Sequence, residues 1–414
     1  MSRRKRVILA VAWTTVIVGT AGPGVRATSY EAAEPVRAAD VVTKGVITGP
    51  HYKIRPAVAY DGYMYRFVVD SDYGVFEPTG DGALRKVLNE IRAITALRDT
   101  KNLKAYGEGL KKSTTAPLAF VKNLATNPVD TLSGVPKGTY QIMENVAGSV
   151  TTSRNPAQDS RAQEALKFSA WKRDHANRLG VDPYSRNTML QKELNSVAWA
   201  ATIGDWTTSL VLMPVGGTAV SVVSGLRMSE SVRNALKEQP PARLRMMNDD
   251  KLKAMGIPED LRKQFLDQPH YTPTQSTIMV EALSGLGSAR GREAVLQAAL
   301  GAEDEVMSTF FVIVAQLLRG YHETASPIGA LRAVGRRLVV AEATDGTTMI
   351  PLPVDHLIWT ERVDQVSGTL KDGMSGKAQL WVTGTVSAAA RSGFQGHGFE
   401  VVERARERVP VLDY

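Results

Sequence analysis

Three aspartates in the first quarter of the chain have part of the spacing of a calcium loop. Asp70, Asp72 and Asp81 match positions 1, 3 and 12 of an EF-hand loop. Val75, however, occupies the position that requires glycine, and the residues before the loop alternate like a strand rather than a helix. The sequence therefore predicts a hairpin turn over 71–74 and a helix cap at Asp81, and it assigns no metal site.

Motifs for a nucleophile or a cofactor are sparse. Ser169 and Lys172 form an S-x-x-K pattern, but the companion motifs of that enzyme class are missing from the sequence, as is a G-x-S-x-G elbow. Residues 285–291 are rich in glycine, yet a helical pattern precedes them where a dinucleotide-binding loop requires a strand. The segment reads as a turn between two helices. No cofactor is predicted.

The histidines give no metal or catalytic motif by their spacing. Each lies far from the others in sequence. Where a histidine is adjacent to an acid, the two side chains of the pair point in different directions on one element. A hydrolase site would have to be assembled between the helical and C-terminal parts, from groups such as His322, Glu323, Asp355 and His356. The catalytic residues are therefore left unknown. The six histidines are His51, His175, His270, His322, His356 and His397.

The segment from Trp206 to Leu226 contains 21 residues without a charge. Its length alone would allow a membrane span, but the Pro214–Gly217 sequence interrupts it in the middle. A span tolerates such a break only where neighbouring groups satisfy the freed backbone. We expect a buried helical hairpin here, with a membrane-inserting hairpin over 206–226 as an alternative.

The first residues have the pattern of an export signal. A basic cluster at 3–6 precedes an uncharged apolar run, and small residues at Val25 and Ala27 suit cleavage after Ala27. Removing residues 1–27 takes away five basic residues, so the formal net charge falls from +8 to +3. The basic balance is then poor support for a nucleic-acid partner. We expect a periplasmic or extracellular protein that folds without disulfides, because the chain has no cysteine.

The predicted elements place these residues in an α+β, multi-domain fold. Alternating residues predict strands at 51–60 and 63–70, with Asp61-Gly62 as a two-residue hairpin turn. Strand patterns over 378–382 and 399–402, with a helical pattern over 387–395 between them, predict parallel strands joined by a crossover. A further helix is expected over 360–370. The chain divides into a signal peptide (1–27), a flexible lead (28–45), a small N-terminal α+β domain of β-hairpins and a helix (46–112), a strap punctuated by Pro and Gly (113–159), an all-helical bundle (160–326) and a small α/β domain (327–414).

These observations narrow the function of the protein to three hypotheses. The leading hypothesis is an exported bacterial envelope protein, non-enzymatic, that acts by binding or as a structural element; its partner would be an unknown protein or envelope component. The first alternative is a cofactor-independent hydrolase with its site between the helical and C-terminal domains, because ligand sites favour domain junctions. The second alternative is a helical protein that inserts residues 206–226 into a membrane.

Overall fold

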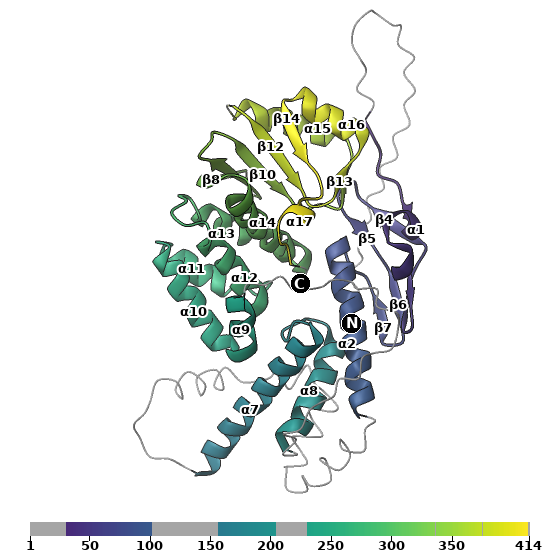
Figure 1. The fold of residues 1–414 in the computed structure, drawn as a ribbon, viewed down its shortest axis with the longest axis vertical. Helices are drawn as coiled ribbons and strands as arrows, with labels where there is room; N and C mark the ends of the chain where they lie inside the picture. The colour runs from purple at the N-terminus through teal and green to yellow at the C-terminus, as the bar shows by residue number, and fades with distance from the viewer. Residues whose placement is uncertain (1–29, 102–155, 204–229, 336, 375, 413–414) are drawn as a thin grey trace, which may run out of the picture.

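The computed structural model has strands at the N-terminal end, helices in the middle and a sheet flanked by helices at the C-terminal end (Figure 1). The predicted α+β, multi-domain class is thereby confirmed. The signal peptide, most of the strap and the uncharged segment 206–226 lie outside the described residues. Those are 30–101, 156–203, 230–335, 337–374 and 376–412, with the side chains of 101, 156–166 and 201–203 also excluded.

The N-terminal region consists of two small antiparallel sheets packed on one long helix. The sheets have the strand orders β1-β4-β5 and β2-β3-β6-β7. Ile54, Phe67 and Val69 pack against Leu84 and Leu88 of α2 to form the core. The elements are β1 (Val36–Arg37), α1 (Ala38–Val41), β2 (Thr48–Gly49), β3 (Tyr52–Ile54), β4 (Ala57–Tyr60), β5 (Tyr65–Arg66), β6 (Val69–Ser71), β7 (Gly74–Phe76) and α2 (Asp81–Lys101).

Two turn predictions in this region have different outcomes. Ser71 pairs with Gly74 between β6 and β7, so the turn over 71–74 is confirmed. The two-residue turn at Asp61-Gly62 is wrong, because Tyr60 pairs with Tyr65 and leaves a loop of four residues. Asp61 itself lengthens the loop, since its Oδ1 accepts the backbone N–H groups of both Tyr63 and Met64.

The predicted flexible lead contains ordered structure in its described part. Val36 pairs with Val58, and Ala38 is buried. The backbone N–H of Glu31 donates to the carbonyl of Trp359 at 2.8 Å. These partners lie far away in the sequence, so residue periodicity alone could not indicate them.

The middle of the chain is helical, as predicted. Thr272 caps α12 through a reciprocal capping box with Gln275. The helices α9 and α10 were not predicted. The elements are α7 (Pro156–Leu179), α8 (Thr188–Ile203), α9 (Glu230–Glu238), α10 (Pro241–Ala254), α11 (Glu259–Leu266), α12 (Pro273–Ser284), α13 (Glu293–Ala299) and α14 (Glu305–Thr324).

A mixed sheet of order β14-β12-β10-β9-β8 forms the C-terminal region. β10, β12 and β14 are parallel, which confirms the predicted crossover, and β9 and β8 are antiparallel. Helices α15 and α16 lie on one face, and α13 and α14 lie on the other (Figure 1). The elements are β8 (Ile328–Val334), β9 (Leu338–Ala343), β10 (Thr348–Leu352), β11 (His356–Leu357), α15 (Glu361–Asp372), β12 (Ala378–Val382), β13 (Thr385–Val386), α16 (Ala388–Gly396), β14 (Phe399–Val402) and α17 (Ala405–Arg408).

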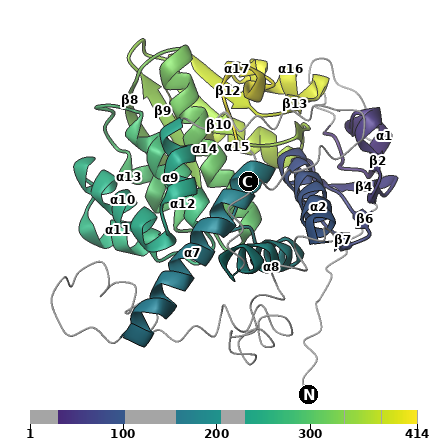
Figure 2. The same ribbon diagram turned by 60° about the horizontal axis from the view of Figure 1, so that its bottom comes forward.

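Helix α8 packs against both α2 and α7, where the N-terminal and helical regions meet (Figure 2). None of the helices in the described part of the chain combines the length and apolar character of a membrane span.

Candidate functional site

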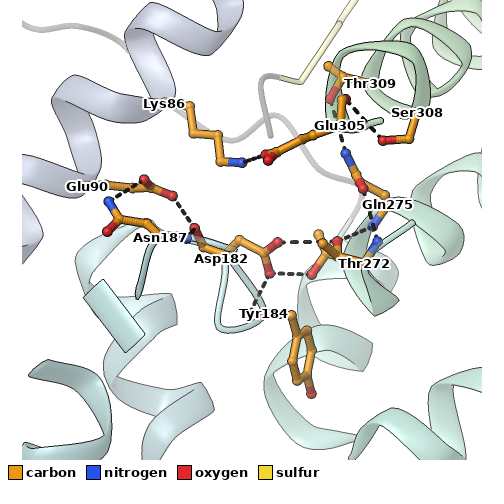
Figure 3. A network of polar contacts seen from close by, with 12 residues as sticks. Lys86, Glu90, Asp182, Tyr184, Asn187, Thr272, Gln275, Glu305, Ser308 and Thr309 are labelled. Carbon is orange, nitrogen blue, oxygen red and sulfur yellow. Dashed lines mark hydrogen bonds and ion pairs between the residues drawn. The ribbon is translucent and has the colours of Figure 1, made fainter. Parts of the chain in front are cut away.

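A network of buried and partly buried polar side chains lies where four segments of the chain meet (Figure 3). Lys86 and Glu90 come from α2, one helical turn apart. Asp182 comes from the loop between α7 and α8. Glu305 begins α14, and Thr272 caps α12. Because these segments are distant in sequence, only the tertiary fold brings their charges together.

Lys86 is the cation at the centre of this network. Its side chain is 14% exposed, and its Nζ lies 2.5 Å from Oε1 of Glu305. Burial opposes the charge, but the carboxylates of Glu90 and Glu305 outweigh it and raise the pKa of Lys86 above its ordinary value. Lys86 is therefore held in its charged form.

Glu90 is nearly inaccessible to solvent, with 3% of its surface exposed. Its Oε1 accepts the hydroxyl of Ser185 at 2.5 Å, and its Oε2 accepts the amide of Asn187 at 2.9 Å. Burial raises the pKa of Glu90, although Lys86 and both hydrogen bonds act in the opposite direction.

Asp182 is the second acid of the network, and its side chain is half-buried. Its Oδ1 accepts the hydroxyl of Thr274 at 2.5 Å and the backbone N–H of Tyr184 at 2.9 Å. Here too burial raises the pKa of the carboxyl group. Gly180, which ends α7 with a φ of 66°, allows the chain to turn sharply into this loop.

A small cavity of about 50 Å³ lies beside the network and is partly open to solvent. Basic side chains from three helices line it, together with the acids Glu90 and Asp182. A cavity with walls fixed by hydrogen bonds is suited to binding a small group with defined orientation. Its lining consists of Lys86, Asn89, Glu90, Arg173, Asn177, Gly180, Val181, Asp182, Pro183, Arg233, Leu236, Lys237 and Thr274.

The S-x-x-K residues lie on α7 close to this cavity. The Ser169 hydroxyl accepts a hydrogen bond from Nη1 of Arg173 at 2.5 Å. Burial lowers the pKa of Lys172 to about 8, against a smaller opposing effect of Asp182. The serine is thus bound to a permanent cation, which cannot take its proton as a general base would.

The four groups named for a hydrolase site have separate partners. Nδ1 of His322 accepts the backbone N–H of Ile328 at 2.9 Å, and Glu323 pairs with Arg319 at 2.7 Å. The carboxylate of Asp355 accepts the backbone N–H groups of Tyr65 and Asp81. Nδ1 of His356 lies 2.8 Å from Oγ1 of Thr385. These contacts do not form a common site.

The aspartates of the calcium-like spacing also separate in the fold. Asp70 pairs with Arg55 at 2.8 Å, and Asp72 lies 2.9 Å from Nδ1 of His51. Asp81 begins α2. Within the described part of the chain, the structure contains no group of three or more His, Asp or Glu residues placed to hold a metal ion.

Sequence reasoning missed the network almost entirely. The one available signal was in α2, where Lys86 and Glu90 are spaced i,i+4 beside the apolar positions Val87, Ile91 and Ile94. Such a pair normally indicates a solvated helix edge. Its burial depends on α8 and on the loop that carries Asp182, and neither contact can be read from a local pattern.

No family model, curated protein or solved structure matches this chain.

Proposed function

We propose that this chain is an exported protein of a bacterial envelope that acts by binding, and that the cavity beside Lys86 and Asp182 is its binding site. The observation that carries this proposal is the cavity itself, whose walls come from α2, α7, α9, the first turn of α12 and the loop after α7. The export signal ending at Ala27 supplies the proposed location. N-terminal sequencing of the secreted chain should begin at Thr28.

The buried network supports a binding role because it makes the cavity walls rigid. Glu90 and Asp182 accept hydrogen bonds from side chains of neighbouring elements, and Lys86 is paired with Glu305. Groups held in this way lose little conformational freedom when a ligand arrives, so more of the contact energy appears as affinity. The hydrolase alternative gains no comparable support, since the groups named for it have separate partners.

A cavity-filling variant tests the proposal. Asn177 lines the cavity, and Asn177→Phe should fill it, whereas Asn234→Phe places the same ring on an exposed part of α9. The wild-type chain and both variants would be screened by thermal shift against pooled small solutes from culture medium.

We expect a solute that raises the melting temperature of the wild type and of Asn234→Phe, but not of Asn177→Phe. Equal shifts in all three proteins would place binding elsewhere. If the wild-type chain hydrolysed an ester, amide or glycoside substrate and Asn177→Phe retained this activity, the proposal would be contradicted outright.

A further inference from the structure

Arg173 lies on the wall of the cavity and is a buried cation. Only 5% of its surface is exposed. Its Nε and Nη2 donate to the carbonyls of Lys237 and Glu238 at 3.0 and 3.2 Å, and its Nη1 donates to the Ser169 hydroxyl. All three acceptors are neutral. Among the described residues no carboxylate forms an ion pair with this guanidinium.

A buried charge without a counter-charge is costly, because the protein interior solvates it poorly. The carbonyls that Arg173 caps belong to the last residues of α9, and a helix C-terminus carries a partial charge of only about −0.5. The end of α9 therefore compensates the guanidinium in part. The rest of the positive charge of Arg173 is left without a compensating negative charge.

The other walls of the cavity add to this positive balance. Lys86, Arg233 and Lys237 also line it, against the two acids Glu90 and Asp182, and Nζ of Lys237 lies 3.8 Å from Oδ1 of Asp174. Burial raises the pKa of both acids, with Lys86 acting in the opposite direction. Lys86 is held charged by its ion pair with Glu305.

We infer that the cavity binds a small oxyanion, the carboxylate or phosphate group of a solute, with Arg173 as its buried counter-charge. The planar guanidinium matches the geometry of both groups and carries its charge at any physiological pH. The volume of about 50 Å³ accommodates the anionic group, and the remainder of the solute would lie in the opening. This inference rests on the proposed binding function and specifies its ligand class.

The test measures the melting temperature of the full chain at constant ionic strength. Chloride is replaced stepwise by inorganic phosphate in one arm and by acetate in the other. Binding to the folded state raises the melting temperature in a saturable way. We expect such a rise in at least one arm, and the arm that responds identifies the anion. Chloride alone serves as the reference.

Two variants locate the anion. Arg173→Met should weaken the apparent affinity by at least about tenfold, because a charge-assisted hydrogen bond is lost. The matched control Arg243→Met removes the same charge from an exposed position on α10 and should leave the affinity unchanged. If Arg173→Met unfolds through loss of its caps on α9, Lys237→Gln, whose side chain is 44% exposed, should still weaken affinity several-fold.

The inference is overturned if neither anion shifts the wild type relative to chloride, or if Arg173→Met and Lys237→Gln both keep the full shift. If neither anion acts but a solute pool still stabilises the wild type and not Asn177→Phe, the proposed binding function stands and only the ligand class changes. If that pool also fails, the binding function falls as well.

Discussion

The C-terminal region contacts the helical region mainly through apolar side chains, whereas several hydrogen bonds join it to the N-terminal region beside the apolar contacts of Tyr63 and Met64. At the apolar boundary, Trp381 of β12 packs against Tyr321 of α14, with ring centroids 5.1 Å apart. At the polar boundary, Tyr60 donates to the carbonyl of His356 at 2.8 Å, and the Asp355 carboxylate accepts two N–H groups from the N-terminal region.

The two boundaries differ in how strongly their contacts depend on the direction of the interacting groups. Burial of apolar surface is non-directional and scales with area, so the apolar boundary depends on volume and shape. Hydrogen bonds require aligned partners, and a carboxylate at the polar boundary can also change its charge with pH. The two boundaries should therefore respond to different perturbations.

Truncation at the apolar boundary should give the largest effect. Trp381 is 5% exposed, so Trp381→Ala leaves a cavity under α14 and should lower the free energy of unfolding by about 3–5 kcal/mol. The measurement is the urea midpoint. Val366→Ala, on the exposed face of α15, is the control and should change stability by less than about 0.5 kcal/mol. Comparable midpoints for the two variants would show that the apolar boundary contributes little.

At the polar boundary, Asp355 should give stability a distinctive dependence on pH. Burial raises its pKa from 3.8 to about 6. Between these values the folded state holds a proton that the unfolded state has released, so this group lowers stability as pH rises from about 4 to 6.5. The expected loss is about 1–3 kcal/mol.

Asp355→Asn should abolish that contribution, which urea titrations of wild type and variant at pH 4.5, 5.5 and 6.5 would measure. Asp345 provides the control, because the N–H of Thr347 holds its pKa below the usual value and its titration ends below this window. Asp345→Asn should leave the slope between pH 4.5 and 6.5 unchanged. An unaltered slope in Asp355→Asn would contradict the assignment.

The smallest expected effect is at Glu31. Its Oε2 accepts the backbone N–H of Trp359 at 2.6 Å and the hydroxyl of Ser387 at 2.5 Å. Glu31→Ala removes both hydrogen bonds at a half-buried site and should lower the free energy of unfolding by about 1 kcal/mol. Glu34→Ala, three residues away and exposed, should have no measurable effect. Equal stability of the two variants would show that the Glu31 contacts do not hold the N-terminal segment to the sheet.

Local sequence signals specified most of the C-terminal region. The strands Ala378–Val382 and Phe399–Val402 have the predicted bounds, and Thr360 and Ser387 cap the helices expected after them. Each signal lies within one element, because side-chain period and capping depend on near neighbours. The turn over 71–74 was predictable for the same reason.

The candidate site could not be predicted in this way. Lys86, Asp182 and Glu305 have ordinary local environments in the sequence, and Arg173 lies in a helix with many charged residues. Their burial, and the pKa shifts of Lys86 and Asp182, arise only when α2, the loop after α7 and α14 meet. The sequence by itself determined most of the elements and the fold class, since these depend on local periodicity and caps. The tertiary structure alone decided which charges share a low-dielectric site, because electrostatic energy depends on distance in space and on burial.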